Sequence, residues 1–242
     1  MGQVAGLQKL TLAFWENDVD ASALIRVGAG IQCLTQLRRL KLLFGGRALD
    51  SEGVGEFAPS LRALTHLEEL RLTFMLTKVG SKGLVRLGEE LPALKKITTL
   101  ALNFRQSRID SEGLMEFGTK LGLMVQLQYL DLDFSCNSIG AEGVGMFGRE
   151  LRTLIQLAWL TLNWESTSLD SEGLIRFAEG LKTLTRLVTL TLKLERNLVG
   201  SASLVQLGVE MKALAALATL DLNLCTTEVD PAGLVQFGQE LA

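Results

Sequence analysis

The chain has 242 residues, of which 48% are hydrophobic and 21% are charged, and its formal net charge at pH 7 is −3. So small a net charge argues against a nucleic-acid partner held by bulk electrostatics. Polar residues interrupt every apolar run before it reaches the roughly 20 residues of a bilayer-spanning helix. The N-terminal residues also lack the basic and long apolar regions of a secretory signal peptide. We therefore expect no membrane span.

A 30-residue unit repeats eight times from Leu7 onward without a slip in register. Each unit opens with the pattern LxxLxL, as in Leu7, Leu10 and Leu12, and only Ile97 departs from leucine. A fixed period of this length indicates a solenoid, in which each repeat buries its apolar side against its neighbours. We expect one domain over 1–242, with repeats 7–36, 37–66, 67–96, 97–126, 127–156, 157–186, 187–216 and 217–242.

The first part of each repeat has the alternation of a strand. In the fourth repeat Leu100, Leu102 and Phe104 point to one face, whereas Ala101 and Asn103 point to the other. Such period-two alternation predicts a strand with one buried face. The inward aromatic residue recurs at Phe14, Phe44, Phe74, Phe104, Phe134 and Trp164, and is replaced by Leu194 and Leu224. Stacked repeats should place these side chains one above another in the core.

A four-residue loop and one aliphatic residue separate each strand from a predicted helix. Aspartates that can accept an N-cap hydrogen bond mark the helix starts at Asp20, Asp50, Asp110, Asp170 and Asp230. Pro231 suits the first helical position, where a missing N–H does no harm. Pro59 falls further inside the second helix, so that helix should end early or bend.

Helical spacing and small residues define the inner side of the predicted helices. Leu114, Phe117 and Leu121 recur at the spacing of one apolar stripe. Gly113 precedes this stripe, but Ala23 and Ser203 stand at the equivalent place in other repeats. A positive φ would disfavour alanine and serine, so we interpret this position as requiring a small volume. On this interpretation Gly113→Ala should be tolerated.

The pattern LxxLxLxFxxxx[VIL]xxxGxxx[FL]xxxLxxLxx resembles the leucine-rich repeat, and the resemblance covers Leu7 to Ala242. The helical second half of each unit is similar to the ribonuclease-inhibitor-like class. The loop after the strand is two residues longer than in that family. The family's asparagine is kept only at Asn17, Asn137 and Asn197, with other residues at this place in the remaining repeats.

The resemblance and the geometry of stacking agree on the architecture. Stacked parallel strands lie about 4.8 Å apart, whereas packed helices need about 8–10 Å, so the stack must bend with its strands inside. The fold class is therefore α/β: a leucine-rich-repeat solenoid that forms a right-handed open arc, with parallel strands on the concave side and helices on the convex side. The resemblance implies a protein-binding scaffold and names no partner.

Two clusters stand out among the side chains that the strands display outward. Lys9, Arg39, Lys41 and Arg71 form a basic patch on the first three repeats. Tyr129, Asp131, Asp133, Trp159 and Asn163 form an acidic–aromatic patch on the fifth and sixth repeats. Exposed aromatics beside carboxylates suit the centre of a protein interface. The alternative for both patches is a solvated sheet whose charges serve solubility. Trp15, in the first loop, either contacts the partner or covers the first repeat.

Little in the sequence favours catalysis or metal binding. Asp131 and Asp133 lie on one open strand without a histidine or further metal ligands nearby, and His66 is the only histidine. We expect no catalytic residues, no metal and no cofactor. The cysteines, Cys33, Cys136 and Cys225, fall in repeats too far apart to pair, which favours free thiols in a reducing compartment.

The function predicted from the sequence is a non-enzymatic, intracellular and cytoplasmic scaffold that binds a protein partner with its concave sheet and loop rim. One alternative is a structural subunit that associates end to end through uncapped terminal repeats, or a segment of a longer repeat protein. The other, by analogy with one branch of the family, is activation of a GTPase through Arg39, Arg71 or Arg105, although no local motif selects any of them.

Overall fold

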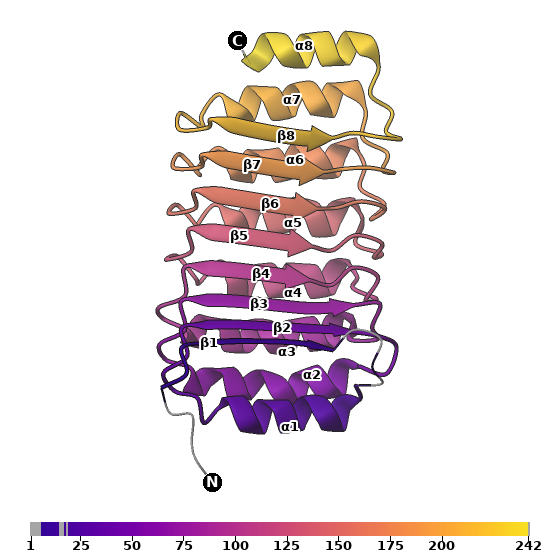
Figure 1. Cartoon of the computed structure of the whole chain (residues 1–242). Coiled ribbons are helices and arrows are strands. Elements are labelled where there is room, and N and C mark those ends of the chain that lie inside the picture. Colours follow the sequence, from indigo (N-terminus) through magenta and orange to yellow (C-terminus); the bar gives the residue numbers. More distant parts are fainter. Residues whose placement is uncertain (1–5, 15–16, 18, 242) are drawn as a thin grey trace.

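The computed structural model describes residues 6–14, 17 and 19–241. These residues form one parallel sheet with the strand order β1 to β8, each strand hydrogen-bonded to the next along the chain. The strands are β1 (Lys9–Phe14), β2 (Arg39–Gly45), β3 (Glu69–Met75), β4 (Thr99–Asn103), β5 (Tyr129–Asp133), β6 (Trp159–Asn163), β7 (Thr189–Lys193) and β8 (Thr219–Asn223). One helix follows each strand, so every repeat is a strand, a loop, a helix and a return (Figure 1).

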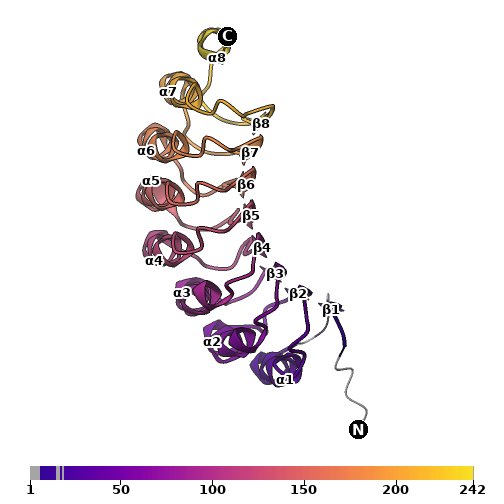
Figure 2. The same cartoon turned by 90° about the vertical axis from the view of Figure 1, so that its left-hand side faces the viewer.

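The helices cover one face of the sheet. They are α1 (Ala21–Ile31), α2 (Ser51–Phe57), α3 (Gly80–Glu90), α4 (Ser111–Leu121), α5 (Gly140–Leu151), α6 (Ser171–Leu181), α7 (Ser201–Met211) and α8 (Pro231–Leu241). Seen along the strands, the helices fan out on the outer side of an open arc and the strands lie closer together on the inner side (Figure 2). The expected solenoid, with a concave sheet and convex helices, is confirmed.

The register of the sheet aligns each residue with its equivalent 30 positions away, as in Leu72 with Leu102. The inward leucines of the central repeats are consequently buried almost completely. The aromatic rings form the expected ladder, with neighbouring centroids 5.4–5.9 Å apart from Phe14 to Trp164. Trp164 replaces phenylalanine in this ladder, and its buried indole N–H has no acceptor among the described residues. Fit to the stacked core therefore outweighs the cost of one unpaired donor.

The helix boundaries follow the predicted capping residues. The Asp110 carboxylate accepts a hydrogen bond of 2.9 Å from the N–H of Gly113, and the other four predicted aspartates do the same in their repeats. Pro231 is the first residue of α8. The helix α2 ends at Phe57, and the chain continues through Pro59 as the 3₁₀ helix η1 (Ala58–Ala63), as expected for a proline that cannot donate a helical hydrogen bond.

Neighbouring helices approach more closely at the small positions than the sequence suggested. A Cβ atom added to Gly113 would lie 2.2 Å from the Cβ and 2.8 Å from the Cα of Ser81 in α3. The expectation that Gly113→Ala is tolerated is therefore wrong. Ala23 was a misleading precedent, because α1 is the first helix described and no earlier helix packs against it. Ser203 is accommodated locally, with its Oγ 3.3 Å from that of Ser171.

From the fourth repeat onward, one loop position alternates between a hydroxyl residue and asparagine. Asn137 and Asn197, in the fifth and seventh repeats, are buried in the loops. The Asn137 side chain accepts from the N–H groups of Ser107 and Ile109 in the preceding repeat and donates to the carbonyls of Phe104 and Phe134. Asn197 does the same one pair of repeats later. Ser107, Thr167 and Thr227 occupy this place in the fourth, sixth and eighth repeats, so asparagine and hydroxyl residues alternate over the fourth to eighth repeats. Arg47 and Thr77 in the second and third repeats do not follow this alternation.

The close helix contact leads to the first prediction. Gly113→Ala should lower the free energy of unfolding by about 1–3 kcal/mol, because overpacking against the Ser81 backbone outweighs the higher helix propensity of alanine. Gly30→Ala is the matched control, since a Cβ there meets nothing within 4 Å and the change should stabilise α1 by about 0.5–1 kcal/mol. Urea denaturation of both variants measures the difference. Equal stability of the two would disprove close contact at Gly113.

Candidate functional site

The outward side chains of the strands form rows across the concave face, because every strand pairs with its neighbour in the same register. Lys9 lies beside Arg39, and Lys41 lies between Thr11 and Arg71. The structure thus brings the predicted basic patch together. Lys9, Arg39 and Lys41 are exposed, whereas Arg71 is partly covered.

A carboxylate that the sequence prediction left out sits inside this basic patch. Glu69 lies beside Arg39 in the register, and its Oε1 accepts a 2.6 Å bond from the Nε of Arg71. Its other oxygen lies 3.7 Å from the Nε of Arg39. Within the described residues, Lys9 and Lys41 form no ion pair. They therefore carry the part of the positive charge that no carboxylate of the described residues neutralises.

The two predicted patches are continuous. The rings of Tyr129 and Trp159 stack with centroids 5.7 Å apart, and the Arg71 guanidinium lies 5.4 Å from the Tyr129 centroid. Arg71 reaches diagonally across the intervening strand β4, where its own register neighbour is the small Ala101 and that of Tyr129 is Thr99. An arginine over an aromatic face is held by the ring quadrupole. Arg71, Tyr129 and Trp159 thus form one row of stacked side chains over four strands.

The space above Ala101 forms a hollow of about 300 Å³ in the concave face. The side chains that line it belong to both patches and include Lys41, Arg71, Asn103, Asp131 and Asp133. A second hollow of about 360 Å³ adjoins it over β1 to β3 and is lined by Lys9, Arg39, Lys41, Glu69 and Arg71. Cations therefore line one side of the concave surface and carboxylates line the other.

The two aspartates of the hollow are in different states. Asp133 accepts bonds of 3.0 and 2.6 Å from the N–H and hydroxyl of Ser135, and one of 3.2 Å from the side chain of Asn103. Asp131 accepts no hydrogen bond from the described residues. Burial raises the pKa of the Asp131 carboxyl, and nearby Asp133 adds to the rise, whereas Arg71 and Lys193 oppose it. Asp131 is thus an incompletely solvated carboxylate.

Asn163, also predicted as a binding residue, has a structural role. Its side-chain oxygen accepts a 3.0 Å bond from the N–H of Glu165, and Asn103 and Asn223 cap their loops in the same way. Asp133 uses one oxygen for the equivalent bond to Ser135. The third outward position of the strand therefore shapes the loop that follows it. Its recurrence as Asn or Asp two residues before the loop was the sequence signal for this role.

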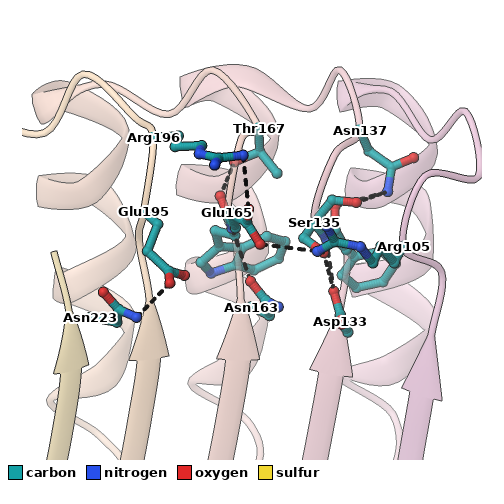
Figure 3. A network of polar contacts seen from close by, with 12 residues as sticks. Arg105, Asp133, Ser135, Asn137, Asn163, Glu165, Thr167, Glu195, Arg196 and Asn223 are labelled. Carbon is teal, nitrogen blue, oxygen red and sulfur yellow. Dashed lines mark hydrogen bonds and ion pairs between the residues drawn. The ribbon is translucent and has the colours of Figure 1, made fainter. Parts of the chain in front are cut away.

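The loop rim beside the sheet is firmly cross-linked. Backbone N–H groups at successive loop tips donate to the next repeat, for example from Cys136 to the carbonyl of Glu165 at 2.8 Å. Glu165 lies 3.0 Å from Arg105 and 3.6 Å from Arg196, so it bridges loops on both sides (Figure 3). The rim is thus a preorganised edge of the concave face. Trp15, the predicted contact in the first loop, lies outside the described residues.

The described residues contain no candidate metal site. Over residues 6–14, 17 and 19–241, no three His, Cys, Asp or Glu side chains cluster in a way that would hold a metal ion. None of the helices there has the length and apolar character needed to cross a bilayer. Cys33, Cys136 and Cys225 are free thiols.

Comparison with known proteins agrees with the observed fold. No protein-family model and no curated protein matches the sequence. Among solved structures, internalin C2 from Listeria monocytogenes str. 4b F2365, a leucine-rich-repeat protein, is similar with a TM-score of 0.51 and 20% sequence identity. The match covers 90% of this chain and 80% of that chain. The chain therefore has the leucine-rich-repeat fold.

The state of Asp131 leads to the second prediction. Its raised pKa means that the folded chain binds this proton more readily than the unfolded chain, so its charge opposes folding at pH 7. Asp131→Asn should therefore raise the free energy of unfolding at pH 7, and the gain should disappear as the pH falls through that pKa. The control is Asp221→Asn, at the equivalent strand position in β8, where the side chain is exposed. Urea denaturation across a pH series tests this, and a loss of stability at pH 7 would contradict it.

Proposed function

We propose that the chain is a non-enzymatic scaffold that binds a protein partner across its concave sheet and the adjoining loop rim. The observation that carries this proposal is the stacked group of Arg71, Tyr129 and Trp159, in which Trp159 is exposed and the other two are partly buried. Arginine, tyrosine and tryptophan are the residue types that most often dominate binding energy at protein interfaces. Trp159 is 42% exposed although it is a large apolar side chain, and its indole N–H is held by Thr161 at 3.1 Å.

The setting of this row supports binding rather than catalysis. The parallel sheet and the cross-linked rim fix the positions of the side chains before a partner arrives, which lowers the entropy cost of association. Lys9, Arg39 and Lys41 at one end, with Asp131 and Asp133 nearer the centre, supply charges that steer and orient a partner. In this proposal the chain needs no cofactor, and the free thiols fit an intracellular location.

The arginines considered for GTPase activation are all engaged by carboxylates. Arg39 and Arg71 lie against Glu69, and Arg105 lies against Glu165. A charge-stabilising arginine would first have to leave its carboxylate partner. We therefore favour the scaffold.

The third prediction tests the aromatic centre. Trp159→Ala and Tyr129→Ala should each reduce the free energy of binding to the native partner by about 2 kcal/mol or more, which raises Kd roughly 30-fold. Neither substitution should prevent folding. Lys41→Glu should have a smaller effect that depends on salt, because exposed charges act mainly on the association rate. The partner would first be captured from the native cell, and calorimetry would then give each affinity.

The control for these variants lies on the convex side. Glu116→Lys changes an exposed residue of α4, far from the sheet face, and should leave the affinity unchanged. If Glu116→Lys abolishes binding while the aromatic variants bind normally, the partner uses the helices and the proposal is wrong.

A second candidate is association of copies through the terminal repeats. The last helix, α8, exposes Leu234, Val235 and Leu241, and the core residues Leu220 and Leu222 of β8 are only partly buried. The fourth prediction follows: an assembling subunit should grow in mass with concentration in sedimentation velocity, and Val235→Lys should reduce this growth. A constant monomer mass over a wide concentration range would rule this candidate out.

A further inference from the structure

Charge is segregated over the first six strands of the concave face, whereas β7 and β8 carry one charge of each sign in Lys193 and Asp221. The outward positions of β1 to β3 carry four cations and one carboxylate, a net charge of +3, in Lys9, Arg39, Lys41, Arg71 and Glu69. Those of β4 to β6 carry only Asp131 and Asp133, a net charge of −2. Both sets line the adjoining hollows and point to the same side of the sheet. A bound molecule that covers both hollows must therefore complement opposite charges at its two ends.

The groups with the greatest remaining capacity to bind lie at opposite ends of this surface. Lys41 is exposed and has no ion pair within the described chain, and Asp131 accepts no hydrogen bond there. They occupy equivalent positions of β2 and β5, three strand spacings apart, which is roughly 14 Å. They are too distant to satisfy one another. Arg71 lies between them, but Glu69 and Tyr129 hold it.

We propose that the concave face binds a polypeptide segment that runs across the strands and has a dipolar charge pattern. A lysine or arginine of this segment would lie over Asp131 and Asp133, and an aspartate or glutamate would lie over Lys9 and Lys41. The inference rests on the proposed function and adds the chemistry and direction of the partner. In an extended segment, about four residues would separate the two charges, and in a helical one about nine to ten.

The repeats themselves supply conservative variants. Asp131→Thr with Asp133→Asn gives the fifth repeat the outward residues of the sixth, Thr161 and Asn163. Asparagine also keeps the acceptor that caps the loop at Ser135, because Asn163 makes the same bond in its own repeat. Lys9→Thr with Lys41→Thr removes the free cations and uses the residue found at the equivalent positions Thr99 and Thr161. Both double variants should fold like the parent.

The test is selection from a display library of random peptides long enough to span these strands, with the full chain as bait. The peptides enriched should carry a basic and an acidic residue at one of the two predicted spacings. The Asp131→Thr/Asp133→Asn variant should bind a synthetic copy of such a peptide with an affinity about tenfold or more lower than that of the parent. A copy whose basic residue is threonine should bind the parent and the variant equally, because it no longer has a charge to place over Asp131 and Asp133.

The remaining outcomes separate this inference from the proposed function. Enriched peptides that depend on Trp159 but lack the charge pattern, or that bind both double variants as well as the parent, overturn the dipolar segment and leave the concave scaffold standing. Peptides that bind the Trp159→Ala variant normally and are lost in Glu116→Lys overturn both. A selection without any enriched peptide also overturns the inference, while capture of the native partner still tests the scaffold.

Discussion

The structure depends on one constraint: every repeat must bury its apolar side chains against the same side chains of the next repeat. No repeat has a complete core of its own, so Leu102 and Phe104 are buried only because Leu72, Leu132, Phe74 and Phe134 lie above and below them. This holds only if the strands pair without a shift. The same register aligns the outward residues in rows, so the concave surface can change one repeat at a time while the core remains intact.

The fold was predictable because its signal was repeated. Strand faces, the aromatic ladder and the capping aspartates are decided by local patterns, and each pattern occurs several times. Contacts between side chains of particular neighbouring repeats were harder to predict. Asn137 bonds to the loop of the preceding repeat, which follows a period of two repeats that a single unit does not reveal. The space available at Gly113 is limited by Ser81 of the neighbouring helix, so the residues of its own helix do not reveal whether alanine fits.

The candidate site was predictable in position and less so in state. Alternation along each strand identified the outward residues, and the register then brought Lys9, Lys41, Tyr129 and Trp159 together. The conformations of long side chains were beyond such reasoning. The diagonal reach of Arg71 across β4 to Tyr129 accompanies a small register neighbour, Ala101, and an ion pair between the guanidinium and Glu69. Asp133 and Asn163 show that one residue can cap a loop and still lie at an outward position of the concave sheet.

These features place the unfavourable elements of the surface where a partner would relieve them. Burial disfavours the charged form of Asp131 and raises its pKa, and Trp159 exposes apolar area. Neither stabilises the free chain. The surrounding structure, by contrast, is stabilised by the aromatic ladder, the helix caps and the hydrogen bonds and ion pairs of the loop rim. A cation over Asp131 would restore the solvation that the carboxylate lacks, and an apolar group on Trp159 would remove its area from water. The stability gained by Asp131→Asn and the binding lost on removal of this charge would then have the same physical cause.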